Sequence, residues 1–245
     1  MGSANKGREI HAEAERKGFL ECETSVGNAL IHMYGKSHSQ EKAQKVFDKL
    51  QNRNIVSWTT LMAGYVQVGE SENVFCIFDR MISECIKPDP ITFVVILNAC
   101  TRIGFLNKSE AYFEAMQEKY CITPTIEHET CMIDLLGRIG ELQKASALII
   151  EKPFTSNIVI WQSLLGACRN WGNVVIGRHA FACALTLDDK DGGAYYCMFN
   201  IYMDAGLWED AQNIDAMISK KTFMRHRLLK VGISAVSKAF TCINP

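Results

Sequence analysis

Apolar residues recur at three- and four-residue steps through most of the 245-residue chain, in stretches that alternate with short polar breaks. This period places the apolar side chains on one face of an α-helix. Glycines separate successive stretches at spacings of 35, 36, 32 and 34 residues, at Gly69, Gly104, Gly140, Gly172 and Gly206. The pattern predicts an all-α chain built from repeated helix–turn–helix units.

A glycine suits the turn inside each unit, because the residue just past a helix end often adopts a left-handed backbone that costs glycine little. His38, 31 residues before Gly69, takes this place in one unit, so we expect a strained turn there. Pro88 and Pro124 follow second helices, and proline stops a helix before the next unit.

The repeats share an apolar core position, which is held by Leu30, Leu61, Ile96, Met132, Leu164 and Met198. Stacked helix pairs of this kind bury a continuous core between neighbouring units. We therefore predict an α-solenoid that forms a right-handed superhelix, with one long concave face where function is expected.

Net charge and hydropathy limit the kinds of binding partner that are expected. The chain has 26 Lys and Arg against 27 Asp and Glu, without the basic excess that phosphate binding usually shows. Reading of base edges needs less net charge than phosphate neutralisation does. No run of about 18 apolar residues occurs, so a membrane span is not expected. Residues 1–8 contain no signal-peptide core, and no transit peptide is visible.

The ten cysteines form no Cys-x-x-Cys pair and match no zinc spacing. Cys100 and Cys168 share one place in the repeat, and Cys131 and Cys197 share another. We therefore predict reduced, buried thiols in a reducing compartment. The histidines are scattered and no phosphate-binding loop occurs, so we expect no enzyme activity, no metal and no cofactor.

Three stretches carry a specific resemblance. Residues 54–65 (NIVSWTTLMAGY) with 86–89 (IKPD) resemble the P-type unit of the pentatricopeptide repeat family, residues 26–34 (VGNALIHMY) resemble its S-type unit, and residues 91–100 (ITFVVILNAC) resemble its L-type unit. Units here vary from 31 to 36 residues, whereas tetratricopeptide units stay close to 34. This variation favours the pentatricopeptide family.

Downstream, residues 126–128 (IEH) with 134–138 (DLLGR) resemble the last S-type unit of the PLS subclass. Residues 160–169 (IWQSLLGACR) and 206–211 (GLWEDA) resemble parts of two E-type units. The resemblance covers residues 7–225 and implies a partial L-type repeat at 1–23, S-type at 24–54, P-type at 55–89, L-type at 90–125, S-type at 126–157, E-type repeats at 158–191 and 192–225, and a divergent basic tail at 226–245.

The resemblance implies binding of single-stranded organellar RNA by a factor that selects cytidines for conversion to uridine in mitochondria or chloroplasts. In the family, one base per repeat is read by the fifth residue of the first helix and the last residue of the unit. Carried over, these positions are Asn28 with Asn54, Thr59 with Asp89, Val94 with Thr125, and Thr130 with Asn157.

By the family's rules the Asn pair favours a pyrimidine, Thr with Asp favours guanine, Thr with Asn favours adenine, and the Val pair is nearly unselective. The expected RNA is 5′-pyrimidine, G, any base, A, then three unread bases and the target C. Apolar second-position residues sandwich the base in relatives. Val56 and Ile91 fit that role, whereas Ser25 and Glu127 do not.

The family's deaminase domain needs His-x-Glu with a distant Cys-x-x-Cys, to hold zinc and move protons. His11-Ala-Glu13 matches only the first half, inside a repeat helix. Catalysis would therefore come from a deaminase-bearing relative or an editing cofactor, bound through residues 158–225. A basic cluster at residues 220–227 with Lys230 is a candidate phosphate contact.

Two other interpretations stay open. The chain could be a protein-interaction scaffold of tetratricopeptide-like helical repeats with no RNA role. It could also be a truncated, inactive fragment, because the array is expected to begin in the middle of a repeat.

Overall fold

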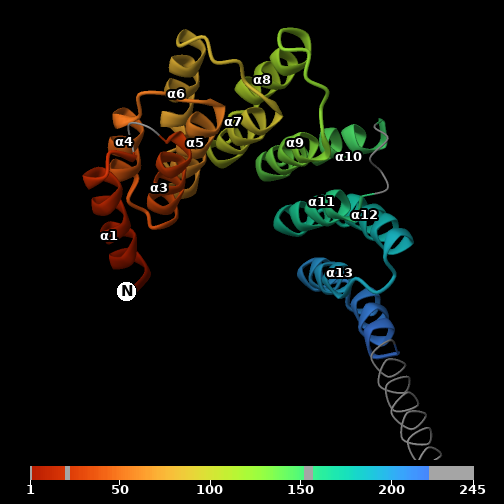
Figure 1. Cartoon of the computed structure of the whole chain (residues 1–245). Coiled ribbons are helices and arrows are strands. Elements are labelled where there is room, and N and C mark those ends of the chain that lie inside the picture. The colour runs from red at the N-terminus through yellow and green to blue at the C-terminus, as the bar shows by residue number, and fades with distance from the viewer. Residues whose placement is uncertain (1, 20–22, 152–156, 221–245) are drawn as a thin grey trace, which may run out of the picture. The chain divides into compact units, whose positions relative to one another are not determined.

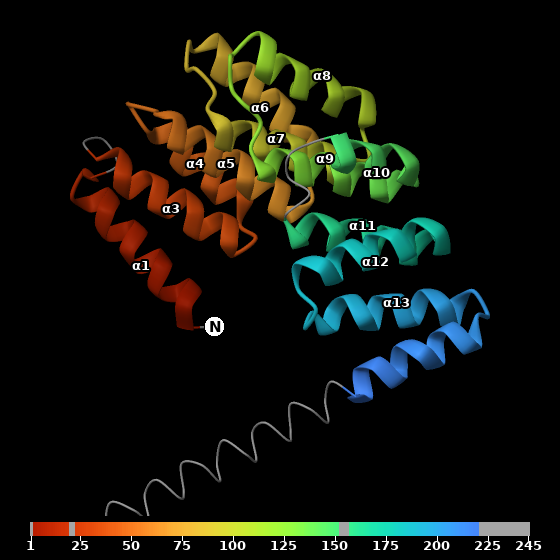
Figure 2. The ribbon, with the colours of Figure 1, turned by 90° about the vertical axis from the view of Figure 1, so that its right-hand side faces the viewer.

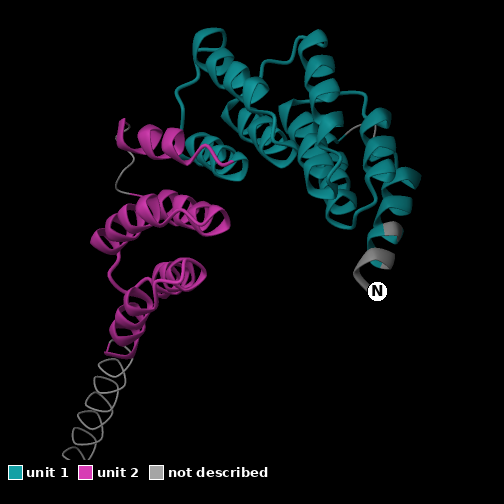
Figure 3. Ribbon diagram, turned by 180° about the vertical axis from the view of Figure 1, so that it is seen from behind, with its two compact units in different colours: residues 1–139 teal, residues 140–245 magenta. Residues whose placement is uncertain are grey.

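The computed structural model describes residues 2–19, 23–151 and 157–220, and within these ranges the chain consists of α-helices and short connections (Figure 1). The chain divides into two compact units, residues 1–139 and residues 140–245 (Figure 3). The predicted basic tail at 226–245, and residues 221–225 of the second E-type range, lie outside the described residues.

Unit 1 contains α1 (Gly2–Arg16), α3 (Thr24–Lys36), α4 (Gln40–Lys49), α5 (Ile55–Val68), α6 (Ser71–Ser83), α7 (Pro90–Ile103), α8 (Leu106–Glu118) and α9 (Ile126–Ile139). Unit 2 contains α10 (Leu142–Glu151), α11 (Ile158–Trp171), α12 (Val174–Leu187), α13 (Gly192–Asp204) and a helical segment over residues 208–220. The assignment of these helices to P-, L-, S- and E-type repeats stays a prediction.

In unit 1 the first helices of successive pairs, α3, α5, α7 and α9, pack one against the next (Figure 2). Each of α4, α6 and α8 packs against the first helix of its own pair. Glycines allow one close approach: a Cβ on Gly35 of α3 would lie 3.3 Å from the Cα of Gly64 in α5. The all-α repeat solenoid predicted from the sequence is confirmed.

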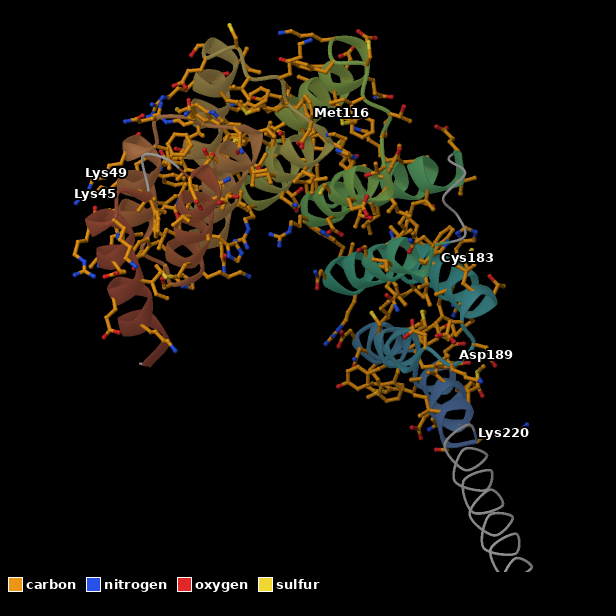
Figure 4. All side chains as sticks on the ribbon, in the orientation of Figure 1. Lys45, Lys49, Met116, Cys183, Asp189 and Lys220 are labelled. Carbon is orange, nitrogen blue, oxygen red and sulfur yellow. The ribbon has the colours of Figure 1, made fainter. Side chains whose placement is uncertain are left out.

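Aromatic side chains fill the core of unit 1. Trp58 and Phe47 are fully buried and meet edge to face, with ring centroids 4.7 Å apart. Phe78 and Phe93 form a similar pair at 6.0 Å. Met116 of α8 is also fully buried and is labelled in Figure 4. Burying side chains of this size is the main source of the unit's stability.

The turns have the predicted backbone. Gly69, which ends α5, has φ +87°, and the glycines at 104, 140, 172 and 206 also have positive φ. His38 adopts the same conformation with φ +54°, which confirms the strained turn. The turn closes in the same way in both cases, because the next residue's N–H bonds back to the helix: Ser39 to the Tyr34 carbonyl at 2.9 Å, and Glu70 to the Tyr65 carbonyl at 3.0 Å.

Unit 2 is built on α11, which packs against α10, α12 and α13. Trp161 and Leu164 of α11 are buried, and Phe181 of α12 meets Tyr195 of α13 edge to face at 5.3 Å. Other large apolar side chains of this unit are exposed, among them Val175 and Trp208. Unit 2 therefore has its own buried core and also presents large apolar side chains at its surface.

The prediction about the cysteines is confirmed in part. Cys100, Cys131 and Cys168 are buried, and burial raises the pKa of their thiols to about 11, 12 and 12. Cys76, Cys85 and Cys121 are exposed, contrary to the prediction. Cys85 and Cys121 have positive φ just beyond the ends of α6 and α8, where the chain turns at the surface.

None of the described helices is both long and apolar enough to cross a membrane.

Candidate nucleic-acid interface

The predicted base-reading positions lie where two neighbouring first helices begin. The last residue of one repeat is the residue before the next first helix, so Asn54 precedes α5 and Asp89 precedes α7. The fifth residue of the preceding first helix lies opposite, because α3 packs against α5 and α5 against α7. This packing places Asn28 on the helix next to Asn54, and Thr59 on the helix next to Asp89.

Asn28 and Asn54 show this directly, because the Asn28 Nδ2 donates to the Asn54 Oδ1 at 3.3 Å. The same Oδ1 accepts from the Ser57 N–H at 3.0 Å and from the Ser57 hydroxyl at 3.1 Å. This capping box satisfies an N–H group at the start of α5. Because the cap requires the oxygen to face the helix, the Asn54 side chain has its Nδ2 donor left for a ligand.

Asp89 caps α7 in the same manner. Its Oδ1 accepts from the Thr92 N–H at 2.7 Å and from the Thr92 hydroxyl at 2.8 Å. The carboxylate also lies at the positive end of the helix dipole, which stabilises its charge. Since one oxygen is committed to the cap, the other carboxylate oxygen is left as an acceptor. Asn54 and Asp89 thus offer opposite chemistry at equivalent places.

Thr59 and Thr130 occupy the fifth position in α5 and α9. The Thr59 hydroxyl donates to the Ile55 carbonyl at 2.9 Å, and the Thr130 hydroxyl donates to the Ile126 carbonyl at 2.7 Å. The hydroxyl hydrogens are therefore used within the helices, and the oxygens have acceptor lone pairs left. Thr59 is only 8% exposed, so a base must come close to the helix to reach it.

The pair Val94 and Thr125 is organised differently. The Thr125 hydroxyl donates to the Glu127 carboxylate at 2.5 Å and also lies 2.8 Å from the His128 Nδ1. The hydrogen bond from Thr125 lowers the pKa of Glu127. The other ring nitrogen of His128 contacts the Pro90 carbonyl at 2.9 Å. Thr125 is thus held by the first turn of α9, at the start of the next repeat, and the Val94 side chain has no polar atom to offer.

Thr130 belongs to unit 1 and Asn157 to unit 2. Asn157 precedes α11, and its Oδ1 accepts from the Val159 N–H at 2.8 Å. This is again a cap, so the Asn157 Oδ1 faces the helix and its Nδ2 is left as a donor.

The second-position residues Val56 and Ile91 are 49% and 63% exposed, although both are large and apolar. They follow the capping residues by two positions, on the first turn of α5 and α7. Ser25 and Glu127 hold the same place in α3 and α9 and are also exposed. An apolar side chain beside each capping residue can pack against the face of a planar ring.

The sequence reasoning did not identify one further pair. Gln162 and Asp191 hold the fifth and last positions of the repeat that begins with α11, and the Gln162 Nε2 donates to the Asp191 Oδ2 at 2.7 Å. Their spacing from Ile158 and Gly192, the first residues of α11 and α13, was the signal that could have found them.

The His-x-Glu sequence lies in α1 and its side chains have structural partners. The His11 Nδ1 is 2.8 Å from the Tyr34 hydroxyl, and Glu13 pairs with Lys17 at 3.0 Å and with Arg16. Across the residues that the structure describes, no three His, Cys, Asp or Glu side chains are grouped so that they could hold a metal ion.

Comparison with known proteins gives consistent matches. A sequence model described as the PPR repeat family matches residues 53–102, and a second, described as the PPR repeat, matches residues 28–55 and 91–121. A chloroplastic pentatricopeptide repeat-containing protein of Arabidopsis thaliana is 37% identical over 92% of this chain and 26% of its own length. A mitochondrial one from the same plant is 36% identical over 87% of this chain and 24% of its own.

Solved structures agree on the fold. The crystal structure of the pentatricopeptide repeat protein PPR10 from maize matches with a TM-score of 0.64 at 19% identity, over 81% of this chain and 30% of that one. PPR10 in complex with an 18-nt psaJ RNA element matches with a TM-score of 0.62 at 16% identity, over 80% of this chain and 40% of that one. The chain spans about a quarter of the length of the two Arabidopsis relatives. By its repeats and its relatives, this chain is a pentatricopeptide repeat protein.

Proposed function

We propose that this chain binds single-stranded RNA with base selectivity, through the paired residues at the starts of its first helices. The observation that carries the proposal is the cap at Asn54 and Asp89. In each side chain the cap commits one oxygen to the helix and so determines which atom is left for a base, a donor in Asn54 and an acceptor in Asp89. Such paired side chains, one pair per repeat, are how these modules read RNA.

The chemistry supports the expected bases. The acceptor oxygens of Asp89 and Thr59 suit guanine, whose Watson–Crick edge carries adjacent N–H donors. An amide donor in place of that acceptor, as at Asn157, suits a base that presents an acceptor at this point of its edge, such as adenine. Val56 and Ile91 supply the apolar surface against which the bases stack. A solved relative in complex with RNA, PPR10, has the same fold.

The proposed cellular role is based on the similar proteins. Chains named as chloroplastic and mitochondrial are among the similar proteins, and we propose that this chain acts in one of these organelles as a site-recognition factor for conversion of cytidine to uridine. Catalysis would come from a deaminase-bearing partner held by residues 158–225. In the described part of that range, Val175, Tyr196 and Trp208 are 80%, 62% and 59% exposed. A partner would cover such side chains.

A binding titration tests the proposal. Fluorescence anisotropy at constant salt would compare an RNA containing 5′-pyrimidine-G-N-A with a scrambled RNA of the same composition. We expect tighter binding of the first RNA, and we expect Thr59→Ala to weaken it by about three- to tenfold, the value of one hydrogen bond. The matched control is Thr123→Ala, an exposed threonine outside the predicted positions.

Equal affinity for the two RNAs would refute the proposal. Indifference of binding to Thr59→Ala, with Thr123→Ala also unchanged, would favour the protein-interaction scaffold.

A further inference from the structure

Unit 2 contains a pair of polar side chains with the geometry of a base-reading pair. Gln162 is the fifth residue of α11, and Asp191 immediately precedes α13. The Gln162 Nε2 donates to the Asp191 Oδ2 at 2.7 Å, while the Asp191 Oδ1 accepts from the Gly193 N–H at 3.0 Å. Gln162 is exposed and Asp191 is half-buried. One carboxylate oxygen therefore caps α13, and the other lies at the surface beside an amide.

This arrangement is similar to the Asn28–Asn54 pair of unit 1, in which the fifth residue also donates to the capping side chain, at 3.3 Å, although there it donates to the oxygen that makes the cap. A third feature recurs as well. Val159, the second residue of α11, is 50% exposed, close to the 49% of Val56 in α5. A donor at the fifth position, an Asn or Asp cap and an exposed apolar second residue thus coincide in a repeat that the sequence assigned only to partner binding.

We infer that Gln162, Asp191 and Val159 form a further site for an RNA base. In the register that the family implies, this base follows the A of the 5′-pyrimidine-G-N-A core, so it is the first of the three bases otherwise left unread. This inference rests on the proposed function and extends it into unit 2. Val159 packs against one face of the base, while the two polar side chains contact its edge.

The atoms left at the surface determine the preferred base. The Asp191 Oδ2 has lone pairs beyond the one used by Gln162, and the Gln162 Oε1 is a second acceptor. Two acceptors match a base that presents two donor groups. Guanine presents its ring N–H and its amino group next to each other, whereas uracil, cytosine and adenine each present a single donor group on that edge. The site therefore prefers guanine.

The test uses the full chain and four RNAs that share the 5′-pyrimidine-G-N-A core and differ only in the next base. We expect the RNA with guanine there to bind about three- to tenfold more tightly than the others. Asp191→Asn keeps the cap on α13 but exchanges the exposed acceptor for a donor, so it should remove the guanine preference. Gln162→Ala should reduce it, and the control Gln143→Ala, an exposed glutamine of α10, should not change it.

Equal affinity of the wild-type chain for the four RNAs would overturn the inference, as would an equal loss of affinity for all four in Asp191→Asn. The same titration reports selectivity at the core guanine addressed by Thr59 and Asp89. If core selectivity is present and the added base has no effect, only this inference fails. If core selectivity is absent too, the proposed function fails with it.

Discussion

Both units are built from the same kind of helix pair, but their tryptophan side chains differ in exposure. Each buries a tryptophan at the fourth position of a first helix, Trp58 in α5 and Trp161 in α11. Unit 2 leaves two other tryptophans, Trp171 and Trp208, 54% and 59% exposed. The repeat therefore buries aromatic side chains in both units, and unit 2 also presents two tryptophans at its surface.

The caps differ in the same direction. In unit 1, Asn54 and Asp89 each accept from both the N–H and the side-chain hydroxyl of the third helical residue. In unit 2, Asn157 and Asp191 each accept from the N–H of the second helical residue. Two hydrogen bonds from the capped helix hold a side chain to that helix more firmly than one does. We therefore expect base selectivity to be sharper in unit 1 and the surface of unit 2 to be more available to partners.

The largest effect should come from the two kinds of tryptophan. Trp58→Ala removes a fully buried ring that packs against Phe47, and it should lower the free energy of unfolding by about 3–5 kcal/mol. Trp208→Ala should change it by less than about 0.5 kcal/mol, as exposed substitutions usually do. Chemical denaturation followed by circular dichroism measures both. Equal losses for the two variants would show that the contrast between the units is wrong.

Turn glycines of the two units should differ by a smaller amount. Gly69→Ala and Gly140→Ala both place a side chain on a left-handed residue, with φ of +87° and +86°, at a cost of about 1–2 kcal/mol. A Cβ on Gly140 would also lie 3.1 Å from the Trp171 ring, whereas a Cβ on Gly69 meets nothing within 4 Å. Gly140→Ala should therefore lower the melting temperature more. A larger effect of Gly69→Ala would contradict this packing.

The smallest effect at neutral pH concerns the buried thiols. Burial raises the pKa of Cys100 to about 11 and that of Cys131 to about 12. The folded chain therefore keeps these protons while the unfolded chain loses them near pH 8.5, so their contribution to stability is constant below that pH and is lost as pH rises through the folded values.

Alkylation at pH 8, mapped by mass spectrometry, should label the exposed Cys76, Cys85 and Cys121 quickly and Cys100 and Cys131 only after unfolding. Rapid labelling of Cys131 in the folded chain would refute its burial.

Much of the fold was predictable because the same sequence pattern recurs in each repeat. The three- and four-residue apolar steps predicted the helices, and the spaced glycines predicted their left-handed turns, including the exception at His38. Cys85 and Cys121 were not predicted to be left-handed, because the position just beyond a second helix carries no glycine signal. Which cysteines are exposed depends on which helix face meets a neighbour, and that is a property of packing.

The residues of the candidate interface could be predicted from the sequence, but the atoms that they leave available for a ligand could not. Family likeness located Asn54 and Asp89, but the sequence did not show that a cap commits one atom of each side chain to the helix. It also did not show that Asp89→Ala changes two properties together, since alanine removes the cap, at a cost of about 1 kcal/mol, as well as the acceptor. Asp89→Asn separates these properties because asparagine caps a helix as well as aspartate does.

The most direct measurement is therefore the ratio of affinities for two RNAs that differ only in having G or A at the second base of the core, determined for the wild-type chain and for Asp89→Asn. Thermal unfolding should show that the two chains differ in stability by no more than about 1 kcal/mol, the value of the lost interaction between the Asp89 charge and the helix dipole. We expect the wild type to prefer guanine and Asp89→Asn to prefer adenine, each by about three- to tenfold. An unchanged ratio in the variant, or no preference in either chain, would contradict base reading by these residues.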